Sequence, residues 1–343
     1  MADIDIRVTG RAGRITFTRA PALNAMTYDM CMGIDAALRG WALDDAVALV
    51  VIDALGDKAF CAGGDIAELY ATGKAGNFAY GQKFWRDEYR LNALIAEYPK
   101  PVVSFMQGFV MGGGVGIGCH ASNRVVDGST RIAMPECGIG LVPDVGGSWI
   151  LARAPGFLGE YLGLTGARMG PDDAIYAGFA DTYIPRDSWP EVIRHLQKEG
   201  NCDVIAGFAR APEPGRLRHD QGEIDRLFQF GTLEDLLVAL QNDSGDIAIE
   251  ALKAVTRNAP LSMACAAKIT QKLRDGGLGI RDALELEYRF TYRSMICGDF
   301  LEGIRAQIID KDRNPAWKHT PSNVPEPAIA QMLAPLEEAT LTF

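Results

Sequence analysis

The sequence predicts an α/β protein whose first half alternates strands with helices and whose second half is mainly α-helical. Two observations carry this prediction. In the first half, short runs rich in β-branched residues flank a stretch with apolar residues at helical spacing, the order typical of parallel βαβ units. After about residue 190, the apolar residues recur mainly at the spacing of helices.

The elements of the first half follow one another closely. "RITFT" at 14–18 and "VALVVIDA" at 47–54 are typical of strands, the second one buried. Between them we expect a helix over 27–38, with Thr27 as its N-cap. The remaining elements are a long helix from Phe78 to about Glu97 that ends before Pro99 and Pro101, a strand over 101–110, and short strands at "RVVDG" and "RIAMPE".

The second half reads as a series of helices with one loop-like stretch, "ARAPEPGRLRHDQGE" at 209–223. We therefore expect two domains, a strand-containing core over 1–195 and a helical region over 196–343. The helical region would cover the site, mediate association, or both. The expected helices are "DVIAGFA", "EIDRLFQFGTLEDLLVAL", "DIAIEALKAVTRN", "LSMACAAKITQKLRDGG" and one or two within "IRDALELEYRFTYRSMICGDFLEGIRAQIID".

Composition excludes several classes of protein. The 343 residues carry a net charge of −10, which disfavours nucleic acid and anionic membranes as partners. No stretch approaches the roughly 18 apolar residues of a membrane span, and "MADIDIRVTG" is unlike a signal peptide. The seven cysteines form no CxxC pair, and the four histidines show no metal-ligand spacing. We expect reduced thiols, a cytoplasmic location and no metal.

Two glycine-rich segments each follow a predicted strand, "FCAGGDI" at 60–66 and "GGGVGIG" at 112–118. Glycines between a strand and a helix leave backbone N–H groups exposed, which suits negative charge that develops on an oxygen. If Gly64 and Gly113 aim their N–H groups at one point, they form an oxyanion hole for a carbonyl. Two alternatives stay open: tight packing of a helix on the sheet, and a dinucleotide fingerprint from Gly116, Gly118 and Ala121.

The segment "AMPECGIGLVPDVGG" at 133–147 places Glu136 and Asp144 among glycines and prolines. Carboxylates that share a poorly solvated pocket acquire different pKa values, which suits acid–base or nucleophilic chemistry. For Asp144 the structural alternative is an N-cap of the short helix that follows it. Glu136, next to Pro135, has no such simple structural explanation.

At these residues the sequence resembles the crotonase (enoyl-CoA hydratase/isomerase) superfamily. The matching segments are "ITFTRAPALNAMT", "KAFCAGGDI", "GFVMGGGVGIG" and "AMPECGIGLVPDVGG". The resemblance is strongest to its 3-hydroxyisobutyryl-CoA hydrolase branch, through "WRDEYRLN", "PDVGGS", "LELEYRFTYR" and "GDFLEGIRAQIIDKDRNPAW".

The resemblance implies a crotonase-like spiral of ββα turns followed by a mainly helical C-terminal region. It also implies a CoA thioester whose carbonyl sits between the N–H groups of Gly64 and Gly113, with coenzyme A as part of the substrate and no cofactor. Glu136 and Asp144 become the catalytic carboxylates. The implied substrate-binding residues are Glu88, Ala62, Gly63, Asp65, Ile66, Gly112 and Gly116.

One difference from the hydratases distinguishes the hydrolase branch from the hydratase branch of the superfamily. The family resemblance implies that a hydratase binds its water with two glutamates. The first of them would stand at position 116, where this chain has Gly116 and therefore no side chain. Hydrolysis of the thioester is therefore expected, with Glu136 as nucleophile or general base and Asp144 in an open supporting role. The branch implies a small branched 3-hydroxyacyl group from valine breakdown.

Two other functions stay open: a hydratase or isomerase of the same fold, and a CoA-binding protein without catalysis. A homo-oligomer is possible.

Overall fold

The computed structural model describes residues 3–343. Contacts within the chain group into two compact units that alternate along the sequence. The strand unit consists of the segments up to Gly64, Arg90–Ala133 and Arg168–Arg216, and the helical unit consists of Asp65–Tyr89, Met134–Ala167 and Leu217–Phe343. The domain boundary expected between 195 and 196 stays a prediction.

Every strand of the described residues lies in the strand unit, in two sheets. The six-stranded sheet has the order β1-β2-β3-β5-β7-β9, and the three-stranded sheet the order β4-β6-β8. Only β1 and β2 pair antiparallel. The bounds are β1 Ile4–Thr9, β2 Ala12–Phe17, β3 Leu49–Ala54, β4 Ala59–Cys61, β5 Val102–Met106, β6 Phe109–Met111, β7 Asn123–Val126, β8 Arg131–Ala133 and β9 Thr182–Tyr183.

Successive strands alternate between the two sheets. β3, β5 and β7 belong to the larger sheet, and the strand after each of them, β4, β6 and β8, belongs to the smaller one. This alternation confirms the α/β class and the ββα turns that the resemblance implied. It also corrects one prediction, because the single strand expected over 101–110 is divided between β5 and β6. The break is at Gly108, whose φ is +58° and whose missing Cβ would lie 2.2 Å from the Lys58 carbonyl oxygen.

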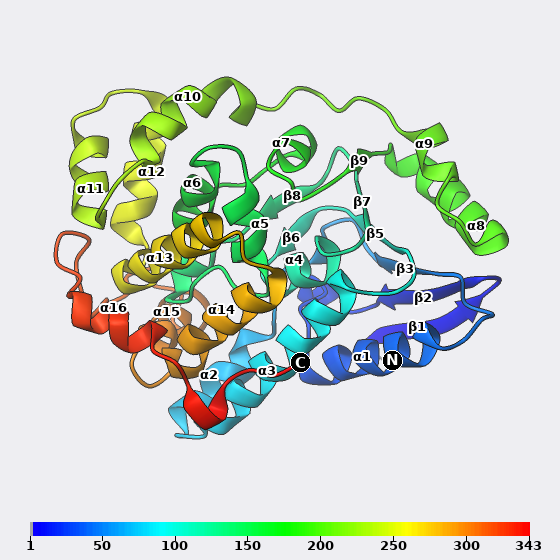
Figure 1. Ribbon diagram of the computed structural model, residues 1–343, viewed down its shortest axis with the longest axis horizontal. Helices are drawn as coiled ribbons and strands as arrows, with labels where there is room; N and C mark the ends of the chain where they lie inside the picture. The colour runs from blue at the N-terminus through cyan, green and yellow to red at the C-terminus, as the bar shows by residue number, and fades with distance from the viewer. Residues whose placement is uncertain (1–2) are drawn as a thin grey trace. The chain divides into compact units, whose positions relative to one another are not determined.

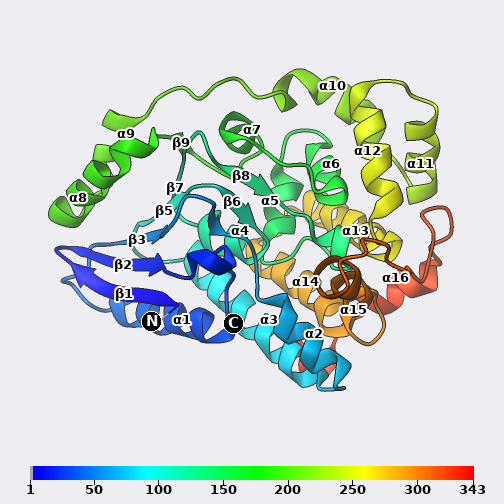
Figure 2. The same ribbon diagram turned by 180° about the vertical axis from the view of Figure 1, so that it is seen from behind.

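Helices cover the larger sheet of the strand unit. α1 (Tyr28–Ala42) starts as predicted, because the Thr27 side chain accepts a hydrogen bond from the Met30 N–H, and it lies beside β1 and β2 in both views (Figures 1 and 2). The unit also contains α4 (Gly113–Gly118), α7 (Pro171–Tyr176) and α9 (Val204–Phe208). α8 (Trp189–Glu199) packs its buried side chains on the sheet residues Val51, Val103 and Phe105.

The helical unit contains no strand among its described residues. α3 (Phe78–Ala96) begins in it and ends in the strand unit. The run expected as one helix over 223–240 is divided between α10 and α11. The loop expected over 209–223 is shorter than predicted, because α10 already starts at Leu217. The other helices are α2 Ile66–Lys74, η2 Glu136–Ile139, α5 Gly147–Arg153, α6 Leu158–Thr165, α10 Leu217–Phe228, α11 Leu233–Gln241, α12 Asp246–Arg257, α13 Pro260–Gly276, α14 Ile280–Ser294, α15 Phe300–Ile304, η4 Arg305–Ile309, α16 Glu326–Leu333 and η5 Glu337–Ala339.

Within residues 3–343, no helix has the length and apolar character that crossing a membrane would need.

Candidate active site

The two glycine-rich loops leave neighbouring strands at the same edge of the smaller sheet. β4 and β6 are parallel, and Cys61 pairs with Val110. Gly64 and Gly113 lie equally far along the chain past these paired residues. The carboxyl ends of parallel strands meet at one edge of a sheet, so both loops start side by side.

The N–H groups of both glycines have no protein acceptor among residues 3–343. Gly113 is the first residue of α4, whose first intrahelical bonds are donated by Val115 and Gly116 to the Gly112 carbonyl. At the other loop, the Gly63 carbonyl accepts from the Met26 N–H at 2.8 Å, and the Gly64 N–H is left unused. An oxyanion hole requires two such unused donors that also point at one oxygen position.

The glycines between these loops are needed for close packing as well. A Cβ on Gly114 would lie 2.2 Å from the Cys61 carbonyl oxygen, and Gly112 has a φ of +48°. The start of α4 can approach β4 only without side chains at these positions. The packing interpretation and the oxyanion-hole interpretation of this run are therefore compatible.

Glu136 is the first residue of η2 in the helical unit, and the residue is 5% exposed. Its Oε2 is buried and has no hydrogen-bond partner among the described residues. A buried carboxylate oxygen without a partner is costly, and such exceptions in native structures are typical of functional groups. This oxygen is available to a substrate carbonyl or to a water.

Two glycines let η2 pack closely on neighbouring backbone within the helical unit. Gly140 has a φ of +77°, and a Cβ there would lie 2.6 Å from the Asp299 carbonyl carbon. A Cβ on Gly303 in α15 would lie 2.2 Å from the Ile139 carbonyl oxygen. The segment "GDFLEGI" thus supports the turn that carries Glu136.

We expect Gly303→Ala to lower the free energy of unfolding by about 1–3 kcal/mol, because the new methyl group overlaps backbone that cannot move aside easily. The matched control is Gly222→Ala, also in a helix of this unit, where a Cβ meets no atom within 4 Å. That variant should be stabilised by roughly 0.5–1 kcal/mol. Urea unfolding measures both, and equal effects of the two changes would contradict the packing of η2 described above.

Asp144 lies 4% exposed and accepts a 2.7 Å hydrogen bond from the Tyr89 hydroxyl. The alternative that Asp144 caps the following helix is wrong. The N-cap of α5 is Gly146, and no side chain caps it from that position. The carboxylate therefore points to a phenol on α3, which fixes its orientation.

Burial raises the pKa of the three carboxyl groups in this cluster, Asp144, Glu136 and Glu88. Burial raises the pKa of Asp144 to about 7, against the opposing effect of the Tyr89 hydrogen bond. The pKa values of Glu136 and Glu88 are raised well above the ordinary value, first by burial and then by the charge on Asp144. Groups that titrate near neutral pH are suited to general acid–base catalysis.

Sequence reasoning missed two members of the cluster, Tyr89 and Glu287. Tyr89 is fully buried, and Glu287 on α14 accepts hydrogen bonds from the backbone just after Asp144. Both lie in segments that carry the resemblance, "WRDEYRLN" and "LELEYRFTYR". Their roles depend on contacts between residues far apart in the chain, which spacing alone does not indicate.

The predicted site residues divide between the two units. Asp65 and Ile66 lie at the start of α2, and the Ala62 N–H donates to the Leu23 carbonyl at 3.1 Å. The strand unit holds Ala62, Gly63, Gly64, Gly112, Gly113 and Gly116, and the helical unit holds Asp65, Ile66, Glu88, Glu136 and Asp144.

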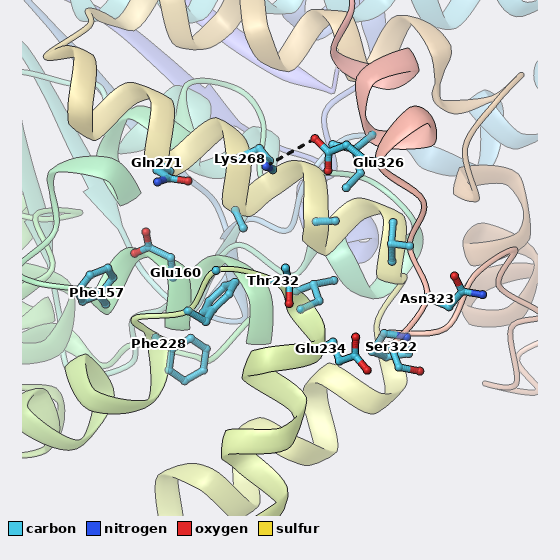
Figure 3. Close-up of a pocket in the computed structure, with 18 of the residues that line it drawn as sticks. Phe157, Glu160, Phe228, Thr232, Glu234, Lys268, Gln271, Ser322, Asn323 and Glu326 are labelled. Atoms are coloured by element: carbon cyan, nitrogen blue, oxygen red, sulfur yellow. Dashed lines mark ion pairs between the residues drawn. The ribbon is translucent and has the colours of Figure 1, made fainter.

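A cavity of about 440 Å³ in the helical unit is lined by none of these residues (Figure 3). Its walls come from α6, α13, residues 228–234 and residues 321–329. Two ion pairs lie in them, Glu160 with Arg274, and Lys268 with Glu326 at 3.7 Å. These charged groups in the cavity walls form ion pairs, whereas the carboxyl groups of the cluster described above form none among residues 3–343. The cavity is therefore a different kind of site from that cluster.

The mixed α/β fold agrees with the results of comparison with known proteins. The chain belongs to the enoyl-CoA hydratase/isomerase family, whose model matches residues 12–333.

Two curated relatives share the name "3-hydroxyisobutyryl-CoA hydrolase, mitochondrial". The protein from Danio rerio is 37% identical, over 97% of this chain and 89% of the relative. The protein from Homo sapiens is 35% identical, over 90% of this chain and 82% of the relative.

Two solved structures are similar over all of this chain. One is described as an enoyl-CoA hydratase from Rhodobacter sphaeroides, with 56% identity, a TM-score of 0.96 and 100% of that chain covered. The other is described as a carnitinyl-CoA dehydratase from Mycobacterium thermoresistibile, with 38% identity, a TM-score of 0.94 and 99% covered.

Proposed function

We propose that this protein hydrolyses a short branched 3-hydroxyacyl-CoA thioester, of the 3-hydroxyisobutyryl-CoA type, to the free acid and CoA. The observation that carries the proposal is the unpartnered, buried Oε2 of Glu136, in the same compact unit as the oriented carboxylate of Asp144. The names of the curated relatives support the substrate class.

In this proposal the N–H groups of Gly64 and Gly113 form the oxyanion hole. Each donates a hydrogen bond to the thioester oxygen and stabilises the negative charge that develops there. Both groups lack a protein acceptor among the described residues, which supports this role. No metal or further cofactor is needed for this step.

Glu136 then acts in one of two ways. As a nucleophile, it attacks the carbonyl carbon, the bond to sulfur breaks, CoA leaves as a thiol after gaining a proton, and water opens the resulting anhydride. As a general base, it takes a proton from a water that attacks the same carbon. In either case Asp144, held by Tyr89, orients the water or carries the proton to the leaving thiol.

Glu88 is the substrate-site carboxyl in the proposal. It is 3% exposed on α3, in the cluster with Asp144, and burial raises its pKa. A protonated carboxyl donates and accepts hydrogen bonds, so Glu88 can bind the 3-hydroxyl of the acyl group. The flanking residues Asp65 and Ile66, with the glycine loops, would bind the rest of the thioester.

The second candidate is a hydratase, and the description of the Rhodobacter sphaeroides structure favours it. Against it stands Gly116, inside α4, where the family resemblance implies the first of two catalytic glutamates in a hydratase. With one glutamate missing, the water that adds to a double bond loses one of its two partners. A CoA-binding protein without catalysis would have no need for a cluster of costly buried carboxyls.

We expect the purified protein to release free thiol from 3-hydroxyisobutyryl-CoA, and to hydrate crotonyl-CoA poorly or not at all. A thiol-reactive dye follows the first reaction, and loss of the enoyl absorbance follows the second. The substrate panel should include acyl-CoAs with and without a 3-hydroxyl. Hydration of crotonyl-CoA with kcat/KM above about 10⁴ M⁻¹s⁻¹, without thiol release from any acyl-CoA, would overturn the proposal.

The cellular compartment and the metabolic role of the reaction are part of the same proposal. No disulfide joins the seven cysteines, which fits a reducing compartment such as the cytoplasm. The curated relatives are named as mitochondrial. A role in valine breakdown follows from the proposed substrate, and a homo-oligomer stays a prediction.

A further inference from the structure

We propose that Glu287 is a positioning residue, which holds the loop after Asp144 and thereby fixes where the Asp144 carboxylate points. This inference deepens the proposed function and rests on it for the role of Asp144. It assigns a task to a carboxyl group that the proposed reaction steps do not use.

The contacts of Glu287 all reach one short loop. Its Oε2 accepts a 2.8 Å hydrogen bond from the Gly146 N–H. Its Oε1 accepts from the Ser148 N–H at 3.1 Å and from the Ser148 hydroxyl. The carboxylate on α14 thus spans the turn between Asp144 and α5.

The backbone of this loop is in a conformation that needs such support. Val145 has a φ of +55° and Gly146 a φ of +78°. A β-branched residue rarely adopts the left-handed region, and it stays there only where the surroundings enforce it. Val145 directly follows Asp144, so relaxation of its backbone would rotate the Asp144 side chain away from Tyr89.

Glu287 has no cation to compensate its burial. Its side chain is 0% exposed, and among residues 3–343 no Lys, Arg or His forms an ion pair with it. The titratable groups around the cluster are Glu88 and Tyr89 from α3, Glu136 from η2 and Asp144 itself. Burial, with the charge on Asp144 as a lesser cause, raises the pKa of Glu287 to about 8. A hydrophobic residue would avoid this cost, but it would leave the Gly146 and Ser148 N–H groups without their acceptor.

A purely structural role is the competing explanation. Glu287 satisfies N–H groups at the start of α5, as a helix cap would. Loss of such a cap lowers stability but leaves the chemistry of the folded molecules unchanged. The experiment must therefore measure the pKa of Asp144 and kcat separately from the free energy of unfolding.

The test compares Glu287→Gln and Glu287→Asp in the full chain. Glutamine keeps the length and places an N–H₂ group against N–H donors, while aspartate keeps the carboxyl group but is too short to span the loop. We expect kcat to fall by about 10- to 100-fold in both variants with KM within about 3-fold, the pattern of a displaced catalytic group. As the loop opens, Asp144 gains solvent and loses the Tyr89 hydrogen bond, which act on its pKa in opposite directions. Burial is the larger cause, so its pKa should fall by about one unit or more in both variants. The ¹³C resonance of the Asp144 carboxyl, titrated by NMR, measures this directly, and the limb of the kcat/KM profile that reports Asp144 should move to lower pH with it.

Two further variants serve as controls. Ser148→Ala removes one of the three hydrogen bonds and leaves the Glu287 carboxylate in place, so it should reduce kcat by about 3- to 10-fold, a fraction of the full loss. It keeps the proposal testable if both Glu287 variants fail to fold. Glu160→Gln removes another buried glutamate of the helical unit, one that pairs with Arg274 in the wall of the separate cavity. Its kcat and the titration of Asp144 should match the wild type.

The proposal is overturned if the folded Glu287 variants keep wild-type kcat and an unchanged Asp144 titration, whatever their stability. It is also overturned if Ser148→Ala has the same kcat and the same Asp144 titration as Glu160→Gln. Wild-type protein that hydrolyses no thioester would instead refute the proposed function. The NMR titration would still decide whether Glu287 positions Asp144.

Discussion

Glu136→Gln should lower kcat for thioester hydrolysis by at least about 10²-fold, the scale of a lost nucleophile or general base. Glutamine has nearly the same shape, so η2 and its packing on Gly303 should be retained. The buried Oε2 loses its charge and its basicity, while the unused N–H groups of Gly64 and Gly113 remain. CoA binding, measured by calorimetry, should therefore stay within about 3-fold of the wild type. A folded variant with near-normal turnover would remove Glu136 from the mechanism.

The same position distinguishes the two roles of Glu136. In a single turnover in H₂¹⁸O, a nucleophilic Glu136 transfers one of its own oxygens to the acid and takes up ¹⁸O from the water. Mass spectrometry would find the label in the peptide that contains Glu136, and the first acid released would carry none. A general base leaves the protein unlabelled and places ¹⁸O in the acid.

The fold could be predicted from the sequence where local signals are strong. The α1 start at Thr27, the long α3 and the buried β3 each follow from periodicity and caps, and the structure confirms them. The break between β5 and β6 could not be predicted. It depends on Gly108, whose left-handed backbone and contact with Lys58 involve another part of the chain. The edge strand β1 was missed, and none of its residues is buried.

The candidate site shows more clearly than the fold which features cannot be predicted from the sequence. The sequence singles out Gly64, Gly113, Glu136 and Asp144 because they lie in glycine-rich segments, which can be recognised without a structure. Tyr89 and Glu287 lie on long helices with ordinary sequences, and they join the cluster only through contacts made in the folded chain. The sequence also could not decide whether Asp144 capped a helix. The answer came from the direction of its side chain, toward Tyr89 instead of the start of α5.

The buried carboxyls should make the protein less stable as the pH rises. Burial raises the pKa of Asp144 from 3.8 to about 7, so between these values the folded state holds a proton that the unfolded chain has released. The folded state binds more protons, and its free energy of unfolding therefore falls with increasing pH. Three units of pKa correspond to about 4 kcal/mol for this one group, lost by pH 8. The raised pKa values of Glu136, Glu88 and Glu287 act in the same direction.

Asp144→Asn tests this cost, because the amide keeps an acceptor for Tyr89 and carries no charge at any pH. Urea unfolding at pH 5, 6, 7 and 8 should show a falling free energy for the wild type and a shallower fall for the variant, in which Glu136, Glu88 and Glu287 still contribute. The variant should be the more stable protein at pH 8, by up to about 4 kcal/mol, and the two should approach each other toward pH 5. Glu191→Gln, which removes an exposed carboxylate, should follow the wild type. If Asp144→Asn also runs parallel to the wild type from pH 5 to 8, then Asp144 is not the buried, destabilised carboxylate that the proposed chemistry requires. A more stable but inactive Asp144→Asn would show that the fold gives up stability to keep this group reactive.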